Sequence, residues 1–242
     1  MTSLVDALGR ELGARVRTGV RVVRLEPEGG AGAMAVHAVD ASGAALPPLR
    51  ARRVVLATPA AVTATLVEPL DAELARLARQ VPSPPVAVAF VGFAAADVAG
   101  VEDGFGLLVA RGETARALGV VFESVVWPDR APAGHAFFRV IYGGGRDPGV
   151  VSLGDAGLRA QVLADLGTLL GLRAEPRFFH VVRHTTGIPQ YVPGHLGRVA
   201  EASARARALG LVLAGNTWRA VAVTDLVREA PAVAQQLRGG GA

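Results

Sequence analysis

The chain has 242 residues, of which 51% are hydrophobic, 19% are charged and 5% are aromatic. That apolar fraction is enough for a hydrophobic core, so the composition excludes an intrinsically disordered chain. Because the sequence contains no cysteine, it also excludes a disulfide scaffold, a thiolate zinc site, an iron–sulfur cluster and a cysteine nucleophile.

The formal net charge is +4, and all 25 basic residues are arginine. Together with the abundant Ala, Gly, Val and Pro, this bias indicates a GC-rich coding sequence rather than a polyanionic partner. The arginine clusters at 50–53 and 205–207 are short and lack interleaved aromatic residues, so we expect no nucleic-acid partner. No apolar run reaches the roughly 20 residues of a spanning helix. Since the first residues also lack a signal-peptide pattern, we expect a soluble or peripheral globular chain.

The first 80 residues alternate between strand and helix patterns. Extended segments are predicted over 15–26 and 34–40, each bounded by turn residues. The apolar run 54–57 predicts a short strand buried on both faces. Pro59 begins a predicted helix, and Asp71 is the expected N-cap of the next one.

Two breaks in composition divide the chain. The first is the proline-rich segment that begins at Pro82, and the second is the segment 189–193. Between them the pattern is rich in strands, with one long helix. The predicted strands cover 86–93, 105–109, 119–126, 135–142 and 177–182, and the predicted helix covers 155–170.

After the second break, a helix ending at Leu209 is predicted to lead into the buried strand 211–214. This strand breaks on Gly215 and Asn216 before a last helix. Such a junction presents free backbone N–H groups and a helix dipole to an anion or an electron-rich ring. The order of elements predicts a first domain, 1–82 and 189–242, that is interrupted by a second domain over 83–188.

His180 and His184 are four residues apart, the spacing of a metal-binding pair on a helix. The surrounding sequence favours a strand, however, so we predict no metal site. Walker A, G-x-S-x-G and H-E-x-x-H patterns are absent from the sequence.

Six blocks occur in the order in which one known family has them. The segments Arg-Ala-Pro-x-Gly at 130–134 and Pro-Gln-Tyr-x-x-Gly-His at 189–195 are specific to that family rather than to flavoproteins at large. The chain resembles the protoporphyrinogen oxidases, flavoproteins of the amine oxidase superfamily, over essentially its whole length. The blocks cover 105–109, 118–124, 127–135, 143–148, 188–198 and 213–216.

The resemblance implies an α/β fold (α+β overall), with a partial FAD/NAD(P)-binding Rossmann-like domain and an inserted mixed-sheet substrate-binding domain. It implies an FAD-dependent porphyrinogen oxidase that oxidises protoporphyrinogen IX to protoporphyrin IX in haem biosynthesis. Hydride would pass to FAD in three rounds, with molecular oxygen as the acceptor. Oxidation of coproporphyrinogen III by the same chemistry is the alternative activity.

The resemblance also assigns site residues. The backbone of Val22 would hold the adenine edge of FAD. No catalytic side chain is assigned, because the flavin performs the chemistry. Ala57 and Thr58 would lie near the diphosphate and ribose; Gly215, Asn216, Val221, Ala222 and Val223 would follow the ribityl chain and flavin ring; and Leu108, Val121 and Ile141 would line an apolar groove for the tetrapyrrole.

The chain departs from the family in one large respect. Family members begin with a strand, a G-x-G-x-x-G turn and a helix, and this sequence has no such fingerprint. We therefore expect the chain to correspond to the C-terminal part of the enzyme, and an inactive half-protein that needs a partner chain is a further alternative. Contact with the cytoplasmic face of the inner membrane, through the N-terminal part, and a homodimer are expected from the resemblance. Ala220 and Ala222 replace two glycines that usually open the family's last helix.

Overall fold

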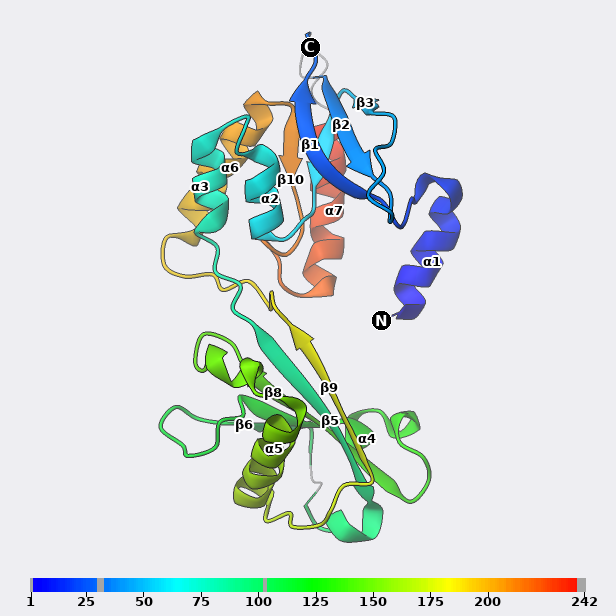
Figure 1. Ribbon diagram of the computed structural model, residues 1–242, viewed down its shortest axis with the longest axis vertical. Coiled ribbons are helices and arrows are strands. Elements are labelled where there is room, and N and C mark those ends of the chain that lie inside the picture. The colour runs from blue at the N-terminus through cyan, green and yellow to red at the C-terminus, as the bar shows by residue number, and fades with distance from the viewer. Residues whose placement is uncertain (1, 30–32, 102–103, 239–242) are drawn as a thin grey trace. The chain divides into compact units, whose positions relative to one another are not determined.

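The computed structural model describes residues 2–29, 33–101 and 104–238 (Figure 1). The chain divides into two compact units: the first unit is Met1–Val81 with Tyr191–Ala242, and the second unit is Pro82–Gln190. The division falls after residues 81 and 190, against expected boundaries after residues 82 and 188.

The first unit contains two small sheets and flanking helices. Strands β1, β2 and β3 form an antiparallel sheet, and β4 pairs in parallel with β10. Leu25, Met34 and Trp218 are among the side chains of its core. Its elements are α1 (Thr2–Leu12), the 3-10 turn η1 (Gly13–Arg15), β1 (Arg21–Pro27), β2 (Met34–Val39), β3 (Leu49–Ala51), β4 (Val54–Leu56), α2 (Ala60–Val67), α3 (Ala72–Arg79), α6 (His195–Ala208), β10 (Leu211–Leu213) and α7 (Val223–Arg238).

Two helix starts in the first unit are confirmed. Pro59 is the N-cap of α2, where its fixed φ angle suits the chain entering a helix. Asp71 is the N-cap of α3, and its carboxylate accepts a hydrogen bond of 2.9 Å from the backbone N–H of Leu74. That bond satisfies one of the backbone donors that a helix start leaves free.

The prediction that the strand at 54–57 is buried on both faces is wrong. Strand β4 forms, and Leu56 is only 4% exposed, but Val55 on the other face is 38% exposed. A continuous apolar run indicates only what could be buried. In the described part of the chain, the Val55 face of β4 is left partly open.

The second unit is built on one five-stranded sheet in the order β6-β7-β8-β5-β9. The expected mixed sheet is wrong in this detail, because every neighbouring pair is antiparallel. Strands β8 and β9 are joined through α5 and run in the same direction, but β5 lies between them. Its elements are β5 (Val86–Ala94), η2 (Ala95–Val98), β6 (Gly106–Leu108), β7 (Gly119–Phe122), α4 (Glu123–Val126), η3 (Pro128–Arg130), β8 (His135–Gly143), η4 (Pro148–Ser152), α5 (Asp155–Leu170) and β9 (Phe178–His184).

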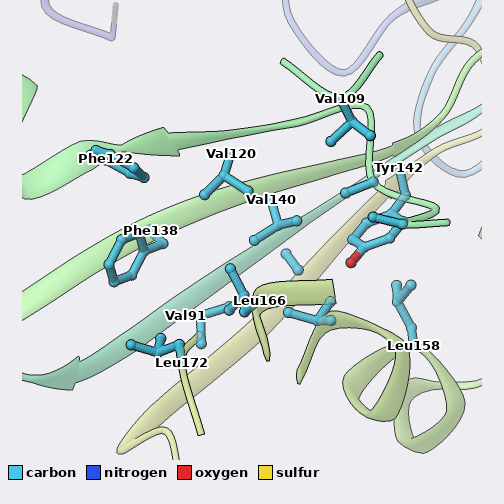
Figure 2. Packing of buried hydrophobic residues seen from close by; sticks show 14 of the residues in the cluster. Val91, Val109, Val120, Phe122, Phe138, Val140, Tyr142, Leu158, Leu166 and Leu172 are labelled. Atoms are coloured by element: carbon cyan, nitrogen blue, oxygen red, sulfur yellow. The ribbon is translucent and has the colours of Figure 1, made fainter. Parts of the chain in front are cut away.

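Helix α5 covers one face of this sheet (Figure 2). Its side chains Leu158 and Leu166 pack with Val91, Val140 and other side chains that alternate along the strands. The helix spans Asp155–Leu170, the range predicted from its apolar spacing, and Gly171 ends it in the left-handed conformation (φ +68°). The opposite face of the sheet is therefore the one left for other contacts.

The strand predicted over 119–126 is too long. Strand β7 ends at Phe122, and the next four residues form the short helix α4. The backbone N–H of Phe137 donates to the Ser124 hydroxyl at 2.9 Å, and the fully buried carboxylate of Glu123 pairs with two arginines. These contacts come from distant residues, so local apolar character does not show them.

Candidate functional site

The carboxyl ends of β4 and β10 meet in the first unit. The two strands are parallel, and the N–H of Ala214 donates to the carbonyl of Leu56 at 2.9 Å. Gly215 has a φ of +89°, and a Cβ built on it would lie 3.4 Å from the carbonyl oxygen of Ala57. Glycine thus allows a backbone conformation that an L side chain would strain. The structure therefore brings Ala57 and Gly215 together.

Hydrogen bonds tie the two strand ends to each other. The Thr217 hydroxyl donates to the carbonyl of Thr58 at 3.3 Å, and the hydroxyls of Thr58 and Thr63 lie 2.7 Å apart. Ala57 and Asn216 are exposed beside these bonds. Four of the predicted cofactor residues (Ala57, Thr58, Gly215 and Asn216) thus form one small surface at the ends of two parallel strands, where ligands of open α/β sheets bind.

Two aromatic residues hold this surface in place, and the sequence reasoning assigned them no role. The Tyr191 hydroxyl donates to the carbonyl of Asn216 at 2.7 Å, and its ring stacks on that of His195 at 4.0 Å between centroids. The buried His195 donates in turn from Nε2 to the carbonyl of Trp218 at 2.9 Å. Burial raises the pKa of Tyr191, so this tyrosine stays a donor at neutral pH. The signal in the sequence was the Pro-Gln-Tyr-x-x-Gly-His segment itself.

Helix α7 begins beside this surface. The carbonyl of Ala222 accepts hydrogen bonds from the backbone N–H groups of Asp225 and Leu226, both at 3.1 Å. Val223 is the first helical residue. The N–H groups of the first turn have no intrahelical acceptor. Gly215, Ala220 and Leu226 line one small cavity, so the exposed start of α7 lies close to the strand ends. An electron-rich ring would be stabilised there by the positive end of the helix dipole.

The remaining predicted cofactor residues lie outside the surface at the strand ends. Val221, Ala222 and Val223 are exposed where α7 starts. Val22 lies in β1 of the other sheet, is 38% exposed and sits at a register shift in the pairing with β2. The structure places Val22 in the same unit but in a different sheet from the four residues at the strand ends.

The three predicted groove residues lie on one face of the second unit's sheet. Leu108 is opposite Gly119, and Gly119 is opposite Ile141. Val121 is two residues beyond Gly119, so its side chain projects to the same side. Val120 and Val140, one position away, belong to the core under α5. We call the side that carries Leu108, Val121 and Ile141 the groove face.

Aromatic residues continue the groove face. Phe90 stacks on Phe137 with 5.9 Å between ring centroids, and Phe137 contacts Phe178 at 6.0 Å. Arg139 lies among them, directly opposite Val121 on one side and Phe90 on the other. This side chain was missed by the sequence reasoning, because its place depends on the strand register.

His180 and His184 lie in β9, as the local pattern predicted. Residues four apart on a strand are about 13 Å apart, so these two side chains cannot reach one metal ion together. Within residues 2–29, 33–101 and 104–238, no cluster of three His, Asp or Glu side chains is arranged to hold a metal ion.

Comparison with known proteins assigns the chain to a family. Residues 1–237 match the family model of the flavin containing amine oxidoreductases. The chain belongs to this family, and the predicted fold class is confirmed. It is 27% identical over 98% of its length to the chloroplastic protoporphyrinogen oxidase of Oryza sativa subsp. japonica, of which it covers 46%. It is 28% identical over 62% of its length to the coproporphyrinogen III oxidase of Bacillus subtilis, of which it covers 32%.

A solved structure has the same fold. The crystal structure is from Exiguobacterium sp. 255-15, and its assignment as a protoporphyrinogen oxidase is provisional. It superposes with a TM-score of 0.80 at 23% identity and covers 98% of this chain and 51% of its own. The chain therefore spans about half the length of the relatives that it matches over nearly its whole length.

One structural finding bears on membranes. Over the part of the chain that the structure describes, no helix combines the length and the apolar character needed to cross a bilayer.

Proposed function

We propose that the chain is the part of an FAD-dependent porphyrinogen oxidase that carries its substrate sheet and one side of its flavin site, and that protoporphyrinogen IX is the substrate. The observation that carries this proposal is the match to a protoporphyrinogen oxidase over 98% of the chain. The geometry supports it, since the predicted groove residues share one sheet face.

The residues of the first unit suit a flavin. Gly215 lets the backbone run close to Ala57, Tyr191 holds the carbonyl of Asn216, and the first turn of α7 offers backbone N–H donors. FAD, when bound, would accept hydride from a carbon that bridges two pyrrole rings and would pass the electrons to molecular oxygen. Three such rounds convert a porphyrinogen into a porphyrin, with peroxide as the other product.

The residues of the second unit suit an apolar ring. Leu108 is 91% exposed, and Val121 and Ile141 are half-buried beside it. These side chains offer contact area and exclude water, while they leave the chemistry to the cofactor.

There are two alternatives to this proposed function. The match to a coproporphyrinogen III oxidase favours the same chemistry on that substrate. The second alternative is an inactive half-protein that needs a partner chain to bind FAD, and it is raised by the absence of a G-x-G-x-x-G turn from the given sequence.

A flavin titration of the 242-residue chain distinguishes the proposed function from the two alternatives. The protein is saturated with FAD, desalted and examined by its visible spectrum. Retained flavin, with porphyrin fluorescence and peroxide appearing when a porphyrinogen is added, supports the oxidase; the initial rates on the two porphyrinogens then choose between the substrates. A colourless protein supports the half-protein.

Two variants show where flavin binds. Gly215→Ala is expected to weaken retention about tenfold, because the added methyl group disfavours the observed φ. Gly29→Ala is the matched control, since a Cβ there meets no atom within 4 Å. Equal retention by the two variants would contradict the assignment of the site to the strand ends.

The cellular location is a further proposal, namely the cytoplasm, at the surface of the inner membrane, and it is supported by the resemblance alone. A homodimer is proposed on the same basis. Cell fractionation and sedimentation measure both.

A further inference from the structure

The groove face carries a fixed cation among apolar side chains. Arg139 lies on β8 two residues before Ile141 and directly opposite Val121. Neighbouring strands are about 4.8 Å apart, and alternate residues along a strand are about 6.7 Å apart. A flat ligand that contacts Val121 and Ile141 therefore has Arg139 within reach of its edge.

A buried carboxylate holds Arg139 in place. Glu123 is fully buried, and its two oxygens pair with Nε of Arg139 at 2.8 Å and Nη1 of Arg130 at 3.0 Å. One carboxylate cannot neutralise two guanidinium groups, so the cluster keeps a net positive charge. Within the described residues Arg139 has no second ionic partner, and its side chain is 31% exposed. The guanidinium is thus preorganised, with donors left over for an anion.

A cavity of about 360 Å³ lies at the end of the sheet where β8 begins. Gly92 and Phe137 belong to its lining, and Phe137 is two residues before Arg139 on β8. Arg130 and Arg177 also line it, and no acidic side chain does. Arg177 is exposed and makes no ion pair within the described residues. The positive character of the groove face therefore extends from Arg139 into a concave, largely apolar space, which suits an anionic group on an apolar body.

We propose that this end of the groove face is a carboxylate subsite, in which Arg139 and Arg177 bind carboxylate side chains of the substrate whose ring lies against Leu108, Val121 and Ile141. The inference rests on the proposed function, since a porphyrinogen is an apolar ring that carries carboxylates. It adds a determinant of specificity to apolar contacts that would hold any flat hydrophobic ring. Both arginines are proposed to bind the substrate and to take no part in the chemical step.

The test is a porphyrin-binding titration of the 242-residue chain, which requires neither FAD nor turnover. The probes are protoporphyrin IX and its dimethyl ester, which differ only in the carboxylates, and the readout is the porphyrin absorption band in a mild non-ionic detergent. Wild-type protein is expected to bind the acid more tightly than the ester. Arg139→Gln is expected to weaken binding of the acid about tenfold and to leave binding of the ester unchanged.

Two further variants keep the test independent of folding. The side chain of Arg177 makes no ion pair within the described residues, and Arg177→Gln is expected to weaken acid binding about threefold. Arg173→Gln removes the same charge beside the C-terminal end of α5 and is expected to change nothing. Acid binding that survives both Arg139→Gln and Arg177→Gln, or acid and ester affinities that fall together, overturns the subsite. Failure of the wild-type chain to bind either porphyrin counts instead against the proposed function.

Discussion

Asp165 is the polar centre of the second unit's core. Its carboxylate is 3% exposed and accepts hydrogen bonds from the Tyr142 hydroxyl at 3.0 Å, the Ala117 N–H at 2.9 Å and the Gln161 amide at 2.9 Å. Burial, and then the neighbouring Asp165, raise the pKa of Tyr142, so the phenol stays protonated and donating. A buried network of this kind is costly to break in part.

Asp165→Ala is expected to lower the free energy of unfolding by about 2–4 kcal/mol, because it leaves two buried donors without an acceptor. Tyr142→Phe removes one hydrogen-bond donor and leaves Asp165 two others. We therefore expect it to lower the free energy of unfolding by about 1 kcal/mol. Urea unfolding measures both. Thr168→Ala, on the exposed side of the same helix, is the control. If Asp165→Ala lowered the free energy of unfolding by no more than Thr168→Ala does, the assigned role of the network would be refuted.

At the scale of the element, Asp71 joins two helices of the first unit. It caps α3 through Leu74, and its Oδ2 lies 3.1 Å from Nη1 of Arg205 on α6. The hydrogen bond from Leu74, and then the pairing with Arg205, hold the pKa of Asp71 below its ordinary value. Because the folded pKa is below the unfolded one, the ionised carboxylate stabilises the protein above the unfolded pKa of about 3.9.

Asp71→Ala is expected to cost about 1 kcal/mol of unfolding free energy at pH 7. The difference from wild type should shrink as the pH falls through the lowered pKa of Asp71, since both chains then lack the charge. Unfolding in urea at pH 7 and pH 3 measures it. Asp6→Ala, on the exposed helix α1, is the control, and a cost for Asp71→Ala that stays constant with pH would contradict the assigned role of the charge.

At the scale of the whole molecule, apolar side chains are exposed on several elements of the first unit. On α1, the residues at helical spacing form a stripe, and Val5 and Leu8 are 66% and 54% exposed. Helix α7 has no buried residue, and Val55 of β4 is 38% exposed. Surfaces of this kind are uncommon on monomers and favour association.

We expect the isolated chain to self-associate at micromolar concentration, as measured by light scattering. Val5→Glu with Leu8→Glu is expected to reduce the association, because each change places a charge in the apolar stripe. Ala41→Glu, in an exposed turn, adds the same type of charge elsewhere and should have little effect. A wild-type chain that is a monodisperse monomer with a cooperative melt would count against this expectation and against the half-protein alternative.

Part of the candidate site can be predicted from the sequence, because the two strands that carry it are visible as apolar runs. The strand that breaks on Gly215 and the strand before Thr58 are visible as apolar runs, and parallel pairing brings their ends together. Val121 and Ile141 were predicted as groove residues from the resemblance alone, and the strand register of the structure puts both on the groove face. Tyr191, Arg139 and Arg177 received no role, because the partners of a polar side chain are not encoded in its neighbours along the chain.

Local patterns determined the elements of this protein. The helix Asp155–Leu170 and the N-cap Asp71 depend on residues within a few positions of one another, and such short-range preferences are legible in the sequence. Tertiary structure alone decided which residues meet. The bond from Thr217 to Thr58 joins positions 159 apart, and the pairing of Arg139 with Glu123 joins strand β8 to helix α4. Register, burial and charge pairing arise only when the whole chain folds, because each depends on side chains that distant segments supply.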